Sequence, residues 1–345
     1  EGLGAEGLGA EEEMVGEDSQ APDPLGRGFE SFEFSDSQIL GFERLGHIKV
    51  EKLIQGSALQ EIQKAVDAEF NSRILESYTQ KMRILGEDAK DLDFIRLSSQ
   101  VSTVLQAREA LKSWCGSRGI EVPFLQGFNL HEGDSPTSQT LRRLACCPRL
   151  GKVMADLLGV DGVRLYQTSS FYKEPGHGET SWHTDLNTAP FDTNGMITCW
   201  IALSDVTTEE DSPLQYASGS HRDNALYWWY SASGMTEHSG RRYELKDHTP
   251  LAPGDATLHH GWLLHSSPPN FSNKTRKAFA MTFISQGSRL LGKAGIRHPP
   301  DGEDLESYAR WVKDLAPRSV VVHPSVPLVW RSQGAEGPRG QGAEG

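Results

Sequence analysis

After residue 163 the chain becomes a series of short β-rich runs separated by Gly, Pro, Asn and Asp residues, and this feature constrains the fold most. The runs are residues 163–172, 196–203, 213–216, 256–258, 262–264 and 278–284. Many short strands with this punctuation are typical of an antiparallel sandwich or barrel and do not fit a βαβ sheet. The second half of the chain is therefore expected to be a mainly β, jelly-roll core.

The chain before residue 163 has helical periodicity instead. Residues 57–66 place three apolar side chains on one helical face, and Ser57 is in position to cap that helix. Residues 99–115 and 138–158 have similar helical patterns. Helices of this kind need a sheet face on which to bury their apolar stripe. The helical front half and the β-rich half are therefore expected to form one domain, residues 36–331, with helices flanking the β core.

The two ends of the chain are expected to be disordered. Residues 1–35 are rich in Gly and carry ten acidic residues against the single base Arg27, which accounts for −9 of the formal net charge of −13. Residues 332–345 have a similar composition. Neither segment contains enough apolar area to offset the entropy that a folded chain loses.

Composition also excludes some partners. An acidic chain lacks the basic face that nucleic acid requires, and no run of about 18 apolar residues is present to span a membrane. The four cysteines include no CxxC pair, which favours reduced thiols and an intracellular, cytoplasmic location. The chain begins with Glu rather than Met, so a processed N-terminus leaves organellar import open. The oligomeric state is left open as well.

A His-x-Asp motif is the first indication of chemistry. In an extended strand, His183 and Asp185 are two residues apart and point to the same side, so an imidazole and a carboxylate can converge on one metal ion. A third ligand must come from elsewhere, and the candidates are His259, His260 and His265. Two His and one carboxylate form the facial triad of non-haem Fe(II) oxygenases, which leaves three coordination positions open.

Arg276, which follows these histidines in the sequence, is a candidate for binding an anionic ligand. Arg276 lies eleven residues after His265, so the two residues could face the same cavity if one ends a strand and the other opens the next. A buried guanidinium with a hydroxyl beside it is suited to the far carboxylate of a dicarboxylate, because Arg binds a carboxylate through two parallel hydrogen bonds.

Taken in order, these and neighbouring motifs resemble the phytanoyl-CoA dioxygenase family of Fe(II)/2-oxoglutarate oxygenases. The resemblance covers about residues 38–286 and implies a double-stranded β-helix core, also called a jelly roll or cupin-like fold, over about residues 160–286. The matching segments are residues 173–176, 182–185, 200–206, 212–222, 254–255 and 264–270, followed by Arg276.

Carried over residue by residue, the resemblance implies that His183, Asp185 and His265 bind iron. It further implies that Arg276 holds the far carboxylate of 2-oxoglutarate, with the Ser267 hydroxyl beside it. The family's cofactors are Fe(II), 2-oxoglutarate as co-substrate and O2, and ascorbate is a candidate stimulant.

Trp200 matches an aromatic residue that lines the co-substrate pocket in the family. The implied activity is oxidation, above all hydroxylation, of an unactivated C–H bond in a small metabolite or acyl derivative, with release of succinate and CO2. Desaturation and cyclisation stay open, and no motif identifies the substrate. Two other classes remain as alternatives: a zinc-dependent hydrolase on a cupin-like barrel, since the same ligands bind zinc, and a catalytically silent binding protein.

Overall fold

The computed structural model describes residues 33–223, 242–292 and 303–333. The predicted tails thus fall almost entirely outside the described residues. Phe34 is buried and the Ser35 hydroxyl caps the first helix, so these two residues before the expected start at residue 36 also take part in the packing. None of the helices in these described ranges is long and apolar enough to cross a membrane.

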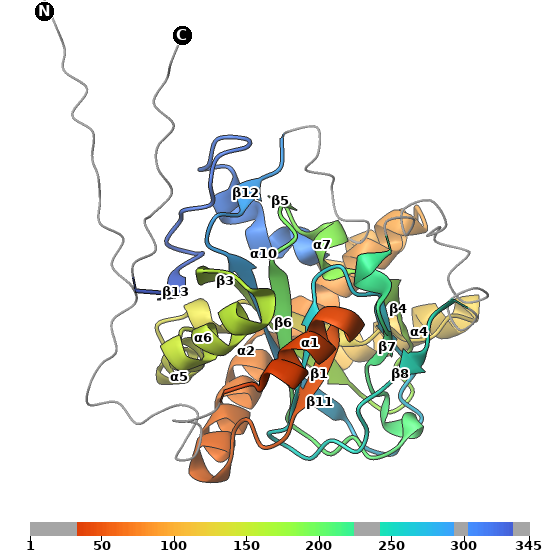
Figure 1. The fold of residues 1–345 in the computed structure, drawn as a ribbon. Coiled ribbons are helices and arrows are strands. Elements are labelled where there is room, and N and C mark those ends of the chain that lie inside the picture. Colours follow the sequence, from red (N-terminus) through yellow and green to blue (C-terminus); the bar gives the residue numbers. More distant parts are fainter. Residues whose placement is uncertain (1–32, 224–241, 293–302, 334–345) are drawn as a thin grey trace, which may run out of the picture.

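Two antiparallel sheets form the core of the molecule (Figure 1). The larger has the order β1 (His47–Val50), β9 (Ala256–His260), β6 (Met196–Ala202), β11 (Arg276–Ser285), β3 (Gly162–Lys173) and β13 (Leu328–Arg331), and β2 (Leu125–Phe128) also pairs with β3. The smaller has the order β4 (Thr180–His183), β10 (His265–Ser267), β7 (Gln215–Ala217) and β8 (Leu245–Lys246). A separate pair consists of β5 (Phe191–Asp192) and β12 (Arg289–Leu290).

Side chains of the small sheet contact one face of the large sheet. The Tyr216 hydroxyl on β7 donates to Thr257 on β9 at 2.8 Å, and Lys173 Nζ on β3 donates to Ser267 Oγ on β10 at 3.1 Å. The fold is therefore the expected double-stranded β-helix, and the predicted mainly β core is confirmed. The space between these two sheets contains the candidate site residues His183, Asp185, His265 and Arg276.

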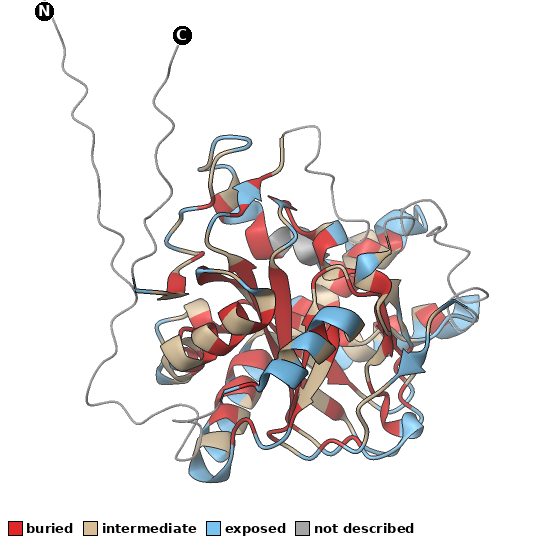
Figure 2. Ribbon diagram, in the orientation of Figure 1, coloured by how far each residue is buried: buried red, intermediate tan, exposed pale blue. Residues whose placement is uncertain are grey.

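The opposite face of the large sheet is apolar and carries the helices. Alternate residues of β6, namely Ile197, Cys199 and Ile201, belong to the main hydrophobic core, as the period of two in a strand requires. Figure 2 shows the buried strands in the middle and exposed helix surfaces outside. The helices are α1 (Asp36–Leu45), α2 (Gly56–Asp88), α3 (Leu92–Ser98), α4 (Val104–Arg118), α5 (Pro136–Ala145), α6 (Pro148–Leu158), α7 (Asp185–Thr188) and α10 (Glu303–Val312), and the short 3-10 turns are η1 (Leu130–Glu132), η2 (Glu209–Asp211) and η3 (Ser220–Arg222).

Several predicted helix boundaries were wrong. Ser57 is not a cap: α2 begins at Gly56 after Gln55, and no side chain caps it. The predicted helix over 99–115 begins only after Thr103, whose hydroxyl caps α4. The predicted helix over 138–158 is two helices, because Pro148 has no N–H to continue α5 and instead opens α6.

Strand predictions were closer, with one clear error. Residues 262–264 are not a strand: a turn closed by the Leu263 N–H on the His260 carbonyl occupies them, and β10 begins at His265. The helical half also contributes β1 and β2 to the large sheet. These two strands are four residues each, too short to show a periodicity that distinguishes strand from helix.

Gly254 makes the turn that leads into β9. Its φ is +92°, in the left-handed region that favours glycine, and a Cβ there would lie 2.1 Å from the Ile54 carbonyl oxygen. Asp255 secures the same turn, because its carboxylate accepts the N–H groups of Lys52 and Ala252.

We expect Gly254→Ala to lower the free energy of unfolding by about 3 kcal/mol or more, through both backbone strain and the clash. Gly56→Ala is the matched control, because Gly56 has φ +59° but no atom within 4 Å of the added methyl. It should cost only the strain, about 1 kcal/mol. Urea denaturation measures both values, and equal losses would contradict this account of the turn.

Candidate metal centre

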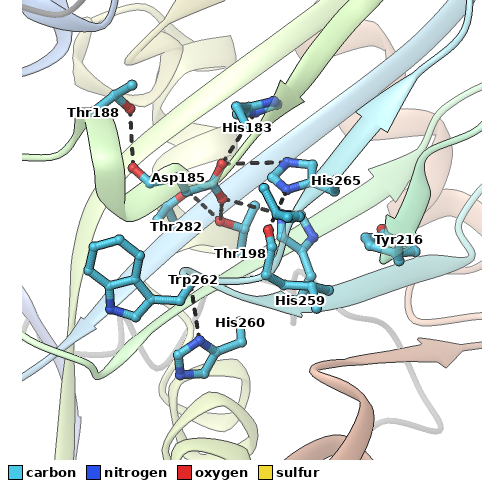
Figure 3. A network of polar contacts seen from close by, with 12 residues as sticks. His183, Asp185, Thr188, Thr198, Tyr216, His259, His260, Trp262, His265 and Thr282 are labelled. Atoms are coloured by element: carbon cyan, nitrogen blue, oxygen red, sulfur yellow. Dashed lines mark hydrogen bonds and ion pairs between the residues drawn. The ribbon is translucent and has the colours of Figure 1, made fainter. Parts of the chain in front are cut away.

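Three predicted site residues converge between the two sheets. His183 ends β4, Asp185 opens α7, and His265 begins β10, directly opposite His183 in the strand register. Their ligand atoms all lie within 4.8 Å of one another, and among the described residues no other group of three potential ligands does so. Asp185 Oδ1 is 3.7 Å from His183 Nε2 and 3.5 Å from His265 Nε2 (Figure 3). The structure thus brings these three side chains together.

Hydrogen bonds set the orientation of both imidazoles. His183 Nδ1 lies 2.8 Å from the Ser181 carbonyl oxygen, and His265 Nδ1 lies 3.0 Å from the Leu263 carbonyl oxygen. A carbonyl only accepts, so Nδ1 carries the proton in each ring and Nε2 presents a lone pair. Both lone pairs are directed at the same carboxylate.

The charge states of His265 and Asp185 suit a cation. Burial lowers the pKa of His265 well below its usual value, so this imidazole is neutral near pH 7. Burial acts to raise the pKa of Asp185, but the neighbouring His265 and His259 outweigh it and lower that pKa well below its usual range. The neutral imidazole of His265 and an ionised carboxylate oxygen of Asp185 therefore face the centre together. A divalent metal ion fits this donor set.

The other two histidines considered as ligands are placed differently. His259 lies in the site, with Nε2 3.2 Å from Asp185 Oδ2, but it is outside the group of three. His260 points away and accepts the Trp262 N–H at 3.1 Å (Figure 3). The alternation of β9 explains the difference, because neighbouring residues of a strand face opposite sides.

Arg276 lies in the same interior, at the start of β11, and is almost fully buried. Its Nη2 donates to Ser267 Oγ at 3.1 Å, and its guanidinium lies 5.4 Å from the Trp200 ring centre. Its Nε is buried without a hydrogen-bond partner, and no carboxylate pairs with it in the part of the chain that the structure describes. Burial accordingly lowers the pKa of Arg276 to about 10. A buried guanidinium without an anion is costly, so this group fits an anionic ligand.

The strip of sheet between Arg276 and the metal centre carries two alanines of β11, with the aromatic side chains of Phe171 and Trp200 beside them. Ala278 and Ala280 follow Arg276 on the same face of β11, and Ala280 lies opposite Ser169 on β3 and Trp200 on β6. The next residue on this face, Thr282, contacts Thr198 beside Asp185. The residues at the two ends of this strip therefore fit the two ends of a chelating dicarboxylate such as 2-oxoglutarate.

Lys173 is a second buried cation in the same place, which the sequence reasoning did not single out. It lies opposite Arg276 in the strand register, and its Nζ is within hydrogen-bond distance of Ser267 Oγ and of the carbonyl oxygens of Ser267 and Pro268. Burial, and then the nearby Arg276, lower the pKa of Lys173 to about 6. The sequence shows Lys173 ten residues before His183, at the end of an expected strand. Only the pairing of β3 with β11 places it beside Arg276.

A jelly-roll barrel that holds two imidazoles and a carboxylate on one face, with a buried arginine further along, defines a non-haem metal enzyme of the oxygenase class. The sequence profile of the phytanoyl-CoA dioxygenase (PhyH) family matches residues 42–278. The chain belongs to this family. It is therefore an oxidoreductase of the 2-oxoglutarate-dependent dioxygenase class, with iron and 2-oxoglutarate as its cofactors.

Individual relatives are distant. A methylphosphonate hydroxylase of Gimesia maris is 27% identical over 49% of this chain, and the match spans 62% of that protein. A phytanoyl-CoA dioxygenase domain-containing protein 1 homolog of Caenorhabditis elegans is 23% identical over 70% of this chain and 87% of its own length. Among solved structures, the carbocyclase SnoK from nogalamycin biosynthesis has a TM-score of 0.58 at 16% identity, covering 86% of this chain and 96% of its own. The last likeness shows the fold.

Proposed function

We propose that this protein is an Fe(II)- and 2-oxoglutarate-dependent dioxygenase that hydroxylates an unactivated C–H bond of a small metabolite or acyl derivative, releasing succinate and CO2. One observation carries the proposal. The same barrel interior contains a three-residue metal donor set and, at the other end of the strip of sheet described above, a buried guanidinium that no carboxylate of the described residues pairs with.

In this proposal, His183, Asp185 and His265 would hold Fe(II) on one face. Arg276 would bind the far carboxylate of 2-oxoglutarate, helped by the hydroxyl of Ser267. When bound, iron and 2-oxoglutarate supply the oxidising chemistry, by which O2 is reduced as the keto acid is decarboxylated. The protein side chains bind and orient, and no protein acid or base is required for the oxidation itself.

Trp200 would hold the guanidinium in place. Its ring lies 5.4 Å from the guanidinium carbon of Arg276, within the range of a cation–π contact. Both residues are buried, and in such a low-dielectric interior a charge-assisted bond from Arg276 to a carboxylate is stronger than in water. We call this surrounding of Arg276 the anion pocket.

The relatives support a small-molecule substrate. One is named a methylphosphonate hydroxylase, and a structurally similar epimerase, SnoN, is described in complex with Fe3+, alpha ketoglutarate and nogalamycin RO (TM-score 0.54, 18% identity, 84% of this chain and 96% of its own). The side of the metal centre at His183 is the most open, since that side chain is 35% exposed against 6% for His265. A substrate would approach from there.

Hydroxylation is tested by screening metabolite pools for stimulation of succinate release by the Fe(II)-loaded protein, followed by mass spectrometry of the product under 18O2. We expect a product that gains one oxygen atom from O2. A product that instead loses two hydrogens would replace hydroxylation by desaturation or ring closure. A product oxygen that comes from water would contradict the proposal.

Lys173 gives a prediction about protons. With a pKa of about 6 it is mostly neutral at pH 7.5. A bound carboxylate beside Arg276 would favour the charged ammonium and raise this pKa, so binding should take up protons, up to one for each 2-oxoglutarate. Anaerobic calorimetry in two buffers of different ionisation enthalpy measures the uptake. Lys173→Met should abolish it, and an uptake that persists in this variant would assign the proton to another group.

A further inference from the structure

The two oxygens of the Asp185 carboxylate have separate sets of neighbours. Oδ1 is the oxygen that faces His183 and His265, at 3.7 and 3.5 Å. Oδ2 instead lies 2.6 Å from the Thr198 hydroxyl and 3.2 Å from His259 Nε2. One oxygen is thus presented to the metal centre, and the other is held by the large sheet.

His259 is the third histidine around the site, and its hydrogen bonds differ from those of the other two. An ionised carboxylate only accepts, so the contact with Asp185 requires the proton on His259 Nε2. His259 Nδ1 is buried and has no partner among the described residues, so it carries no proton that would need an acceptor. In His183 and His265 the proton is on the other nitrogen, because Nδ1 donates to a backbone carbonyl and Nε2 has no such partner.

From this difference we propose that His259 is a positioning residue that, together with Thr198, fixes Asp185 so that only Oδ1 is available to iron. The inference rests on the proposed metal site. His259 itself has no lone pair directed at the centre, so it does not serve as a ligand. By occupying Oδ2, the two donors keep the carboxylate from turning its second oxygen to the metal, where it would take a position that the keto acid needs.

The surroundings hold both donors rigidly. His259 lies opposite Thr198 in the pairing of β9 with β6, and its ring is packed between those of Tyr216 and His265, at centroid distances of 5.6 and 4.4 Å. The Thr198 hydroxyl gives its only proton to Asp185, so the Thr282 hydroxyl, 3.1 Å away, donates to Thr198 in turn. Figure 3 shows Thr198 and His259 gathered on the side of Asp185 away from His183.

The test measures metal affinity and 2-oxoglutarate affinity on the full chain, using anaerobic Fe(II) titration and then 2-oxoglutarate titration of the Fe(II)-loaded protein. The variants are His259→Leu, which removes the donor, and His259→Gln, whose amide N–H can replace the Nε2 proton. His260→Leu is the matched control, because His260 is adjacent on the same strand and does not contact Asp185. Thermal unfolding of each variant separates misfolding from a local effect.

We expect His259→Leu to weaken Fe(II) binding about 10- to 100-fold and to weaken 2-oxoglutarate binding to the loaded protein, although Arg276 is intact. His259→Gln should restore both affinities to within about threefold of the wild type, and His260→Leu should change neither. Thr198→Val should resemble His259→Leu, and the double variant should not be additive, because both donors act on one oxygen.

Two results would overturn the proposal. If His259→Leu binds Fe(II) as the wild type does while His265→Ala does not, the metal site stands and His259 has no positioning role. If His259→Gln fails to restore binding and His259→Leu loses Fe(II) as completely as His265→Ala, His259 is a ligand rather than a donor to Asp185.

Discussion

Replacement of Arg276 by alanine is expected to raise the KM for 2-oxoglutarate roughly 30-fold to several thousand-fold, while Fe(II) affinity changes little. Loss of one partner of a buried, charge-assisted pair costs about 2–5 kcal/mol, and each 1.4 kcal/mol is a factor of ten. Arg276 supplies a buried guanidinium whose Nε has no partner among the described residues. Lys173 lies beside it, but a single ammonium cannot replace the planar pair of donors that a guanidinium offers to a carboxylate. Steady-state kinetics with varied 2-oxoglutarate and an anaerobic Fe(II) titration give the two quantities.

Arg276→Lys is the matched variant, because it keeps a positive charge but loses the planar pair of donors. It should fall between the wild type and Arg276→Ala. An unchanged KM in Arg276→Ala would refute the assignment of the anion pocket, and a parallel loss of Fe(II) binding would show that the substitution damages the metal centre instead.

The largest effect is expected from the residues that we propose as metal ligands. His265→Ala should abolish turnover and weaken Fe(II) binding more than about 100-fold, beyond the effect usual for a residue that only supports a ligand. His183→Ala should do about the same, because the two imidazoles present equivalent Nε2 lone pairs to Asp185 Oδ1. Anaerobic Fe(II) titration of purified variants, with unfolding curves to verify folding, provides the comparison.

His260→Ala is the control for this pair. It contacts the Trp262 backbone and the His221 ring rather than Asp185, so it should keep measurable Fe(II) binding and some activity. Normal iron binding in His265→Ala, together with its loss in His260→Ala, would reverse the assignment of the third ligand.

The sequence contained enough to predict the fold class and the placing of the main site residues. The extended backbone at Thr184 puts His183 and Asp185 on one side, although Asp185 opens α7 instead of continuing the strand. The family resemblance, carried by the ordered motifs, points to His265 and Arg276. These are properties of short segments, and the structure places all four residues in one interior. Pro148 is also a local signal, and it could have predicted the break between α5 and α6. The helical periodicity continues on both sides of Pro148, so a single helix was predicted instead.

Other features depend on contacts between distant segments and could not be predicted. Whether His259 or His260 faces the site depends on where β9 ends, and Gly261 made that boundary uncertain. The role of His259 appears only when β9 pairs with β6 and brings it beside Thr198. Lys173 likewise acquires its neighbour from the pairing of β3 with β11. The periodicity of one segment does not indicate which distant strand it pairs with.

The central claim is that this site performs iron- and 2-oxoglutarate-dependent oxidation. Release of CO2 from 1-[14C]-2-oxoglutarate tests it most directly, measured with the wild type and His265→Ala, with Fe(II) or Zn(II), in air or under argon. The account predicts release only from the wild type with Fe(II) in air. Equal release with Zn(II), release that does not require oxygen, or release that survives His265→Ala would contradict it.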